Sequence, residues 1–295
     1  MRIDLHTHSD VSDGTQPPAG LVRAAADAGL DVMALTDHDT AAGWAEAVAT
    51  AAEVGIRVVP GMEISTELDG HGVHLLAYLP DPRHPALAAE LAAVLEGRNA
   101  RLPATIAKLQ AEGVEIEIDD VLAAVAGVPA ALGRPHVADA LVARGVVADR
   151  SEAFDRWLSA GRPGYVRRYA ADLTTMIGVV RDAGGVTVVA HPWGRTRTPY
   201  LTAERIAALA EAGLAGIEVD HEDHTPDVRR TLRGIAGDLG LVITGSSDHH
   251  GAGKEGHGLG CNTTAPTEFE RLMERAAAAR RATGRPVQEE YAWTL

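Results

Sequence analysis

The chain of 295 residues has little of what marks secreted proteins, membrane proteins and proteins that coat nucleic acid. Its single cysteine, Cys261, has no partner for an intrachain disulfide, which is usual for proteins of a reducing cytoplasm. No apolar run approaches the roughly 20 residues that a membrane-spanning helix needs. Met1 leads into a strand-like segment rather than into a charged and then apolar leader. These absences predict a cytoplasmic protein with no membrane partner.

Basic residues are also scarce. The sequence contains 27 lysines and arginines against 41 aspartates and glutamates, a net charge of −14, and its only lysines are Lys108 and Lys254. A general nucleic-acid interface needs a basic face, so this balance argues against extended duplex nucleic acid as a partner. A nucleotide could still bind locally, because bound metal cations can reverse the electrostatic potential inside a single cleft.

What the sequence does contain is a regular alternation of strands and helices. Three short apolar segments in the first 60 residues read as strands separated by two helices, and the alternation resumes near residue 173. Such spacing predicts an α/β fold with parallel strands joined by right-handed crossovers. We expect residues 1–80 and 166–295 to form this domain. Residues 81–165, whose pattern is helical throughout, are expected to form an inserted all-helical subdomain that covers the active site.

A β-hairpin is expected after the third of these strands. Asp69-Gly70 separates two strand-like runs, and this dipeptide is a strong signal for a two-residue turn. With that turn Leu76 lies opposite Glu63, and His74 shares their face because side chains alternate along a strand. A carboxylate and an imidazole are therefore expected to project together.

Histidine and carboxylate side chains recur directly after the predicted strands. In His6-Thr7-His8 the two imidazoles lie two residues apart on an extended chain, so both can point at one ion. In a barrel of parallel strands these strand ends form one rim, where such barrels build their active sites. The candidate metal ligands are His6, His8, Asp13, His38, Glu63, His74, His191, Asp248 and His250.

Nine ligands are too many for one ion. A zinc-like ion takes about four to six ligands, so this set predicts two or three metal ions that share a bridging carboxylate. Three divalent ions bring about six positive charges against three carboxylates, which leaves an electropositive pocket in an acidic protein. Such a pocket favours an anion, and phosphate is the obvious candidate. Imidazole and carboxylate ligands accept Mn, Fe or Zn alike, so the two or three ions are expected to be divalent or mixed-valence Mn, Fe or Zn.

The chain resembles the polymerase-and-histidinol-phosphatase (PHP) superfamily in six segments that occur in the same order: H-T-H-S-D-x-S-D-G-T, A-L-T-D-H-D-T, P-G-M-E-I-S, V-H-L-L-A-Y, A-H-P and S-D-H-H-G. The resemblance runs from Met1 to Tyr78 and from about Gly185 to Gly251. It implies a distorted (β/α)7 TIM-like barrel with a trinuclear metal centre. In such a centre a hydroxide that bridges two metals attacks phosphorus in line.

The resemblance also implies which residues hold which ion. The first ion would be held by His6, His8, Glu63 and Asp248. The second would be held by His74 and His191, with Glu63 as the bridge. The third would be held by Asp13, His38 and His250.

The helical insertion resembles that of the branch that hydrolyses nucleoside 3′,5′-bisphosphates and trims RNA from its 5′ end. In that branch basic side chains grip the phosphate, and the matching residues are Arg134, Arg162 and Arg195. A guanidinium suits phosphate because its planar fork donates two parallel hydrogen bonds. His224 matches a His-Thr-Pro element and is expected to contact the substrate or protonate the leaving group. The expected substrate is a nucleotide-like phosphomonoester, extending to the 5′ ends of short RNA.

Other functions fit some of the same residues. An amidohydrolase-like enzyme that cleaves C–N bonds also uses H-x-H, but the carboxylated lysine that usually bridges its metals has no obvious position. Lys108 falls in the insertion, and Lys254 follows the last motif. A histidinol-phosphate-type phosphatase of a small molecule would use the same ligands. A non-enzymatic metal-binding scaffold would be expected to lack some of them, and all nine are present.

Overall fold

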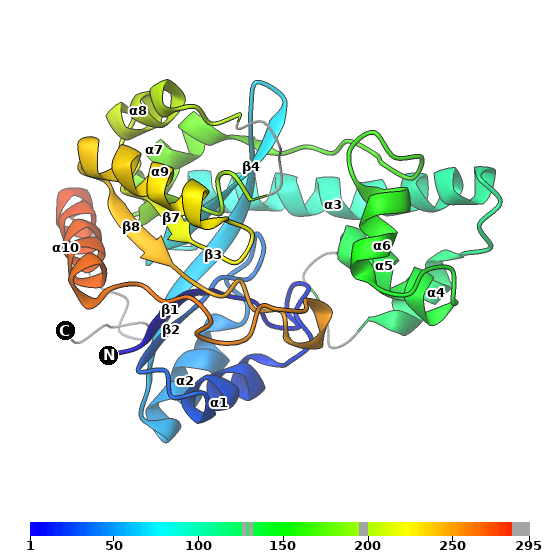
Figure 1. Ribbon diagram of the computed structural model, residues 1–295, viewed down its shortest axis with the longest axis horizontal. Helices are drawn as coiled ribbons and strands as arrows, with labels where there is room; N and C mark the ends of the chain where they lie inside the picture. Colours follow the sequence, from blue (N-terminus) through cyan, green and yellow to red (C-terminus); the bar gives the residue numbers. More distant parts are fainter. Residues whose placement is uncertain (126–128, 130–131, 195–199, 285–295) are drawn as a thin grey trace.

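The computed structural model describes residues 1–125, 129, 132–194 and 200–284. Its sheet curls into a nearly closed barrel in the order β1-β2-β3-β4-β6-β7-β8, with β1 against β8 and a short β5 beside β3 (Figure 1). The expected α/β, TIM-like (β/α)7 barrel is confirmed. The strands are β1 (Ile3–Thr7), β2 (Val32–Leu35), β3 (Arg57–Leu68), β4 (His71–Tyr78), β5 (Ala171–Asp172), β6 (Val186–Val189), β7 (Gly216–Asp220) and β8 (Val242–Gly245).

Helices cover the outside of the barrel (Figure 1). Side chains of β2 alternate between two apolar clusters: Met33 and Leu35 pack with the helices, whereas Val32 and Ala34 belong to the barrel interior. Phe269 of the last helix joins the interior cluster, so this helix covers one end of the barrel. The helices of the barrel are α1 (Pro18–Asp27), α2 (Trp44–Val54), α7 (Leu173–Asp182), α8 (Ala203–Glu211), α9 (Pro226–Asp238) and α10 (Pro266–Thr283).

The β3–β4 hairpin is what distorts the barrel. The first residues of β3 pair in parallel with β2 as far as Pro60, and from Gly61 onwards β3 pairs antiparallel with β4. The predicted register is confirmed, with Glu63 opposite Leu76. Glu63 does not follow the end of a strand, as the sequence pattern had suggested, but lies in the middle of β3. The reason is that pairing with β4 extends the strand beyond the part that β2 supports.

Between β4 and β5 the chain leaves the barrel and forms a helical lobe (Figure 1). The longest helix, α3, has 27 residues and is therefore about 40 Å long. The lobe has its own apolar cluster, which includes Leu109 of α3 and Leu141 of α5. Its elements are α3 (Pro85–Ala111), α4 (Ile118–Ala124), α5 (Arg134–Ala143), α6 (Arg150–Ala153) and the π-helix η1 (Phe154–Leu158). Over the described residues, no helix is both long and apolar enough to span a membrane.

Gly216 marks a close approach between two barrel strands, because a Cβ there would lie 2.5 Å from the carbonyl oxygen of Val242 on β8. We expect Gly216→Ala to lower the free energy of unfolding by about 1–3 kcal/mol, the usual cost of overpacking, in urea denaturation. The control is Gly234→Ala on the exposed face of α9, where a Cβ meets nothing within 4 Å. That change should raise the free energy of unfolding by about 0.5–1 kcal/mol. Equal stability of the Gly216→Ala variant and the wild type would contradict the packing argument.

Candidate metal centre

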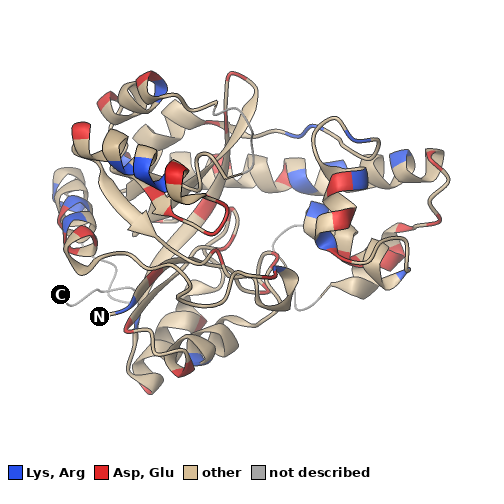
Figure 2. Cartoon of the chain, in the orientation of Figure 1, with Lys and Arg blue, Asp and Glu red and all other residues tan. Residues whose placement is uncertain are grey.

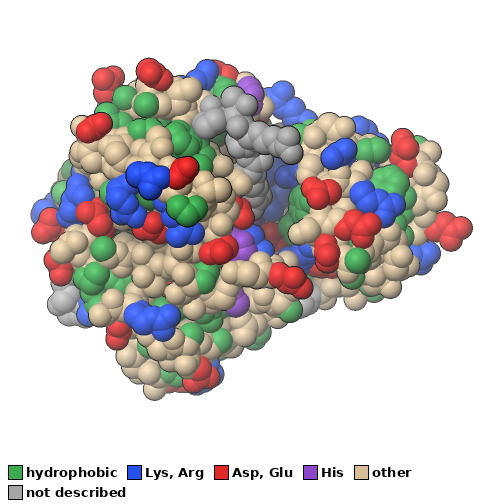
Figure 3. Space-filling view, viewed as in Figure 1, with side chains coloured by type: hydrophobic (Ala, Val, Ile, Leu, Met, Phe, Trp, Pro, Cys, Tyr) green, Lys and Arg blue, Asp and Glu red, His purple; other side chains and the backbone are tan. Residues whose placement is uncertain are grey.

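The nine side chains selected from the sequence lie together at the carboxyl-terminal rim of the barrel. They come from the ends of β1, β6 and β8, from the loops after β1 and β2, and from the facing strands of the β3–β4 hairpin. The most accessible of them, His74, has a side chain that is 25% exposed. Figure 3 shows histidine side chains on the barrel side of a hollow between the barrel and the helical lobe.

Glu63 and Asp248 form the first donor group with His6 and His8. The two Nε2 atoms are 3.0 Å apart, and each lies 3.1–3.4 Å from Glu63 Oε2 and Asp248 Oδ1. Ligands that surround one ion at about 2.1 Å are themselves about 3.0–3.4 Å apart. The spacing of these four atoms therefore fits one metal ion.

The other oxygen of Glu63 faces a second pair of imidazoles. Its Oε1 lies 2.6 Å from His74 Nδ1 and 3.2 Å from His191 Nε2, and the two rings meet edge to face. The hairpin register places His74 here, as the sequence predicted. Glu63 thus presents one oxygen to each group, which is the geometry of a bridging carboxylate.

A third group consists of Asp13, His38 and His250, with His8 adjoining it. Asp13 Oδ1 lies 3.3 Å from His250 Nε2, and Asp13 Oδ2 lies 3.6 Å from His38 Nε2. Among the described residues, His8 Nδ1 is buried without a hydrogen-bond partner, 3.9 Å from Asp13 Oδ1. A neutral imidazole that offers Nε2 to a metal carries its proton on Nδ1, so this nitrogen is a donor that faces the Asp13 carboxylate.

The electrostatics of the site favour cations. Burial alone would raise the pKa of Glu63, but the surrounding imidazoles outweigh burial and hold that pKa well below its usual value. Burial alone would lower the pKa of His6, yet the carboxylates of Asp248, Glu63 and Glu218 raise it well above its usual value. Burial lowers the pKa of His38 to about 3, so this ring is neutral, the form that ligates metals.

Glu218 is a functional residue that the sequence analysis missed. It is fully buried on β7, where Oε1 accepts the Nδ1–H of His6 at 3.1 Å and Oε2 accepts the backbone N–H of His191 at 2.8 Å. The first bond fixes the tautomer of His6 and turns its Nε2 towards Glu63, as carboxylates behind metal-binding histidines commonly do. Its one signal in the sequence was an acidic residue inside an apolar strand.

Asp248 is held from behind by two further residues. Lys254 Nζ donates to Oδ2 at 2.5 Å, and His221 Nε2 donates to the same oxygen at 3.3 Å. His221 Nδ1 accepts the backbone N–H of Asp223, so its proton is on Nε2 and the ring has no lone pair for a metal. Oδ1 of Asp248 is left for the first donor group. Lys254, for which the sequence suggested no position in the site, therefore belongs to its surroundings.

Strained backbone accompanies the site. Asp39, His191 and Asp248 have φ angles of 58°, 26° and 51°, in the left-handed region that costs non-glycine residues about 1–2 kcal/mol. Two of them are candidate ligands and the third follows His38. Such conformations persist only where the surrounding contacts enforce them, and they cluster at functional sites.

His224 lies beside the three donor groups rather than within one. Its Nδ1–H donates to the carbonyl of Val219 at 2.9 Å, and its Nε2 accepts the backbone N–H of Trp193 at 3.3 Å. Its ring centroid is 5.7 Å from that of His221. Both ring nitrogens thus have backbone partners, and a part in substrate contact or proton transfer stays a prediction.

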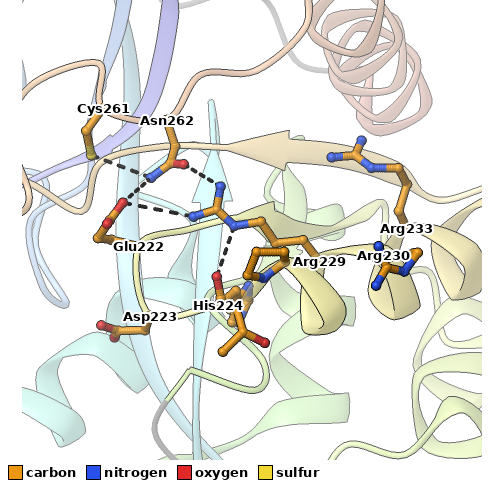
Figure 4. A pocket seen from close by; sticks show the side chains of 10 residues that line it. Glu222, Asp223, His224, Arg229, Arg230, Arg233, Cys261 and Asn262 are labelled. Carbon is orange, nitrogen blue, oxygen red and sulfur yellow. Dashed lines mark hydrogen bonds and ion pairs between the residues drawn. The ribbon is translucent and has the colours of Figure 1, made fainter.

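His224 also lines a cavity of about 860 Å³ on the barrel side of the molecule (Figure 4). The three arginines around this cavity already have protein partners. They bond to neighbours as Arg229 to Asn262, Arg230 to Asp227 and Arg233 to Asp220. The cavity therefore offers no unpaired arginine from this set of three to bind an anion.

A different set of arginines, which we name the arginine cluster, consists of Arg98, Arg101, Arg134 and Arg168. Burial and repulsion from the other three lower the pKa of Arg101 to about 9, and burial with neighbouring guanidinium groups lowers that of Arg168 to about 10. Arg101 is only 8% exposed and, over the described part of the chain, its side chain has no hydrogen-bond or ion-pair partner. Figure 2 shows basic positions along α3 and on the segment that returns from the lobe.

Of the three predicted phosphate ligands, Arg134 lies in this cluster. It begins α5, and its guanidinium lies 5.4 Å and 5.6 Å from the ring centroids of Phe154 and Tyr165. Arg162 is exposed and outside the cluster, and Arg195 lies outside the described residues. The other three members were missed because nothing in the local sequence distinguishes them from surface arginines.

A barrel whose rim gathers six imidazoles and three carboxylates is that of a metal-dependent hydrolase, and comparison with known proteins agrees. The family model described as PHP domain matches residues 4–114. A 3′,5′-nucleoside bisphosphate phosphatase from Chromobacterium violaceum is 37% identical over 88% of this chain and 90% of its own length. A 5′-3′ exoribonuclease from Haemophilus influenzae is 35% identical over 84% of this chain and 90% of its own length.

Solved structures give the same result. A protein assigned as a metal-dependent phosphoesterase, from Bifidobacterium adolescentis, superposes with a TM-score of 0.87 at 38% identity, covering 92% of this chain and 96% of the other. An amidohydrolase from C. violaceum, with bound sulfate and no metal, gives 0.85 at 35% identity over 93% and 97%. The chain belongs to the PHP family. It is a metal-dependent phosphoesterase.

Glu218→Gln tests the support that β7 gives to the site. An amide in this position can donate to His6 Nδ1 and favour the wrong tautomer, so we expect metal affinity to fall about 10–100-fold. The measurement is titration of the apo-protein with Mn²⁺, with Glu211→Gln on the exposed end of α8 as the control. A Glu218→Gln variant with wild-type affinity would show that His6 does not need this carboxylate.

Proposed function

We propose that this protein uses two or three divalent metal ions to hydrolyse a phosphomonoester of a nucleotide that carries a second phosphate, such as a nucleoside 3′,5′-bisphosphate. The observation that carries the proposal is the arginine cluster beside the metal centre, of which Arg98 and Arg101 are buried. The donor groups at the rim would bind the metal ions that act on one phosphate. The mutually repelling guanidinium groups of the cluster would bind a second anionic group of the same substrate.

We assign the ions to the three donor groups. One belongs to His6, His8, Glu63 and Asp248, the second to Glu63, His74 and His191, and the third to Asp13, His38 and His250. When bound, such ions lower the pKa of water and neutralise charge that develops on phosphate oxygens. Glu63 keeps the first two groups at a fixed separation, and Glu218 orients His6 towards them. The donor set accepts Mn, Fe or Zn.

The arginine cluster is connected to the metal centre through β3. Arg98 Nε donates to Asp39 Oδ2 at 2.8 Å, directly after His38, and Arg98 Nη2 donates to Ser65 Oγ at 3.0 Å, two residues from Glu63. Asp39 pairs with Arg98, whereas the side chain of Arg101 has no such partner among the described residues. A phosphate monoester carries about −1.5 to −2 charges near neutral pH and accepts paired hydrogen bonds from arginine. A phosphate bound here would relieve the repulsion within the cluster.

The relatives support this class of substrate. One is named for nucleoside bisphosphates, and another for RNA degraded from its 5′ end. We therefore extend the proposal to short 5′-phosphorylated RNA. Arg134 of the cluster, Arg162 and Arg195 are the proposed contacts to the phosphate, and His224 is the proposed contact near the leaving group.

Hydrolysis of C–N bonds is the second candidate, because one similar structure is described as an amidohydrolase. Those enzymes usually bridge two metals with a carboxylated lysine. In this chain the two oxygens of Glu63 face the first and second donor groups, Lys254 bonds to Asp248, and Lys108 donates to the carbonyl of Tyr165. These contacts favour phosphate as the substrate group.

The test is a hydrolysis screen of the metal-loaded protein over mononucleotides, 3′,5′-bisphosphates, 5′-phosphorylated short RNA and cyclic amides. We expect the highest kcat/KM with a 3′,5′-bisphosphate. Asp13→Asn and His38→Asn should each lower that turnover more than about 100-fold, because each removes a metal-binding atom. The control is His71→Asn at the exposed tip of the hairpin. Wild-type turnover in either variant, or amide hydrolysis alone, would overturn the proposal.

Arg101→Met tests the second phosphate. Loss of a charged hydrogen-bond donor worth about 1.5–3 kcal/mol should raise KM for a bisphosphate about 10-fold or more and leave a mononucleotide nearly unchanged. Removing a buried, repelled charge should also raise the free energy of unfolding of the ligand-free protein by about 1–3 kcal/mol.

The matched control for this variant is Arg144→Met, in the same lobe but exposed and paired with Asp120 at 3.2 Å. It should change neither KM nor stability appreciably. An equal rise of KM for both substrates in Arg101→Met, or a loss of stability, would contradict a phosphate site at the cluster.

A further inference from the structure

The helical lobe contacts two loops that carry proposed metal ligands. One loop follows β1 and contains Asp13, and the other is the turn η2 (Gly251–Gly253), which follows His250. Thr15 ties the loops together. Its Oγ1 donates to the carbonyl of His250 at 3.3 Å and accepts the backbone N–H of Ala252 at 3.0 Å.

Arg150, the first residue of α6, reaches both loops from the lobe. Its Nη1 donates to the carbonyl of Asp13 at 3.2 Å and to the carbonyl of Gly253 at 3.4 Å. Its other N–H groups are bound by Asp139 of α5, with Nε 2.5 Å from Oδ1 and Nη2 2.6 Å from Oδ2. A bidentate pair orients a guanidinium rigidly, so Asp139 aims Nη1 at the barrel.

The surroundings of this contact leave no space for larger residues. A Cβ on Gly253 would collide with the guanidinium of Arg150, and a Cβ on Gly251 would collide with Thr15 Oγ1. Gly251 also has a φ of 65°, which favours glycine. The ion pair with Asp139 outweighs burial and raises the pKa of Arg150, so the side chain stays charged at neutral pH. The contact therefore depends on one defined arrangement of both loops.

We propose that Arg150 is a positioning residue that couples docking of the helical lobe to binding of the third metal ion, at Asp13, His38 and His250. The inference rests on the metal assignment proposed above. Arg150 grips the backbone of Asp13 and of the turn after His250, so it favours the arrangement in which both side chains face the same ion. By linkage, the ion must favour docking of the lobe by the same factor.

The coupling has a consequence for the substrate. Arg98 and Arg101 belong to α3 and Arg134 to α5, so the lobe that Arg150 fastens also carries most of the arginine cluster. Metal binding would then stabilise the position of the phosphate-binding side chains. The site would be complete only when the ion and the docked lobe are present together.

Two measurements on purified, full-length apo-protein test the proposal. In Mn²⁺ titrations, Arg150→Met should weaken one class of binding site about 10–100-fold and leave the others within about twofold. Added to Asp13→Asn, it should cause no further loss. In amide hydrogen exchange, Mn²⁺ should slow exchange in residues 134–158 of the wild type, and Arg150→Met should abolish that effect.

Two variants keep the test decisive. Asp139→Asn leaves the arginine in place but weakens the bidentate pair that orients its guanidinium. It should shift both readouts in the same direction, and it replaces Arg150→Met if that variant fails to fold. Arg144→Met removes an exposed arginine of the same lobe and should leave both unchanged. Wild-type Mn²⁺ affinity and exchange in Arg150→Met, or an equal loss in Arg144→Met, would overturn the coupling. Neither readout needs substrate, so a protein that shows the coupling but releases no phosphate would contradict only the proposed function.

Discussion

One buried carboxylate, that of Glu63, is the contact on which the arrangement of the rim depends. Imidazoles from β1, β4 and β6 and from the loop after β2 all converge on its two oxygens. A buried carboxylate is costly unless cationic or hydrogen-bonding partners surround it, so these elements can close around Glu63 only with their imidazoles facing inward. Glu63 reaches the interior because β3 exchanges its parallel partner for an antiparallel one just before it. The distortion of the barrel and the position of Glu63 between the imidazoles therefore have one cause.

The charge near the site differs in sign from the net charge of the chain. A protein with a charge of −14 repels polyanions over most of its surface, where acidic residues are spread over many elements (Figure 2). The arginine cluster and the metal-binding rim are local exceptions, close to one another through Arg98 and Asp39. Buried, mutually repelling cations cost folding free energy, and an anionic ligand recovers it. This trade between stability and binding is common at functional sites, and it suits a small, highly charged substrate.

The barrel and the helical lobe contribute different chemistry to one hollow (Figure 3). The barrel contributes the imidazoles and carboxylates, whose positions follow from strand pairing. The lobe has its own apolar cluster and contributes guanidinium groups on α3 and α5. Arg150 is one direct polar link from the lobe to the loop of Asp13. A lobe that could not be fastened to those loops would hold its arginines at no defined distance from the reacting phosphate.

The sequence by itself determined the strands, the register of the hairpin and the identity of the candidate ligands. Those features are local: alternation specifies the faces of a strand, Asp-Gly specifies a turn, and strand ends in a barrel share one rim. Only the tertiary structure decided that Glu63 lies mid-strand, that Glu218 stands behind His6, and that Lys254 reaches Asp248. It also decided which arginines are buried. The reason is physical: a carboxylate, an ammonium or a guanidinium acquires its role from partners far away along the chain, and no local pattern encodes whether those partners surround it.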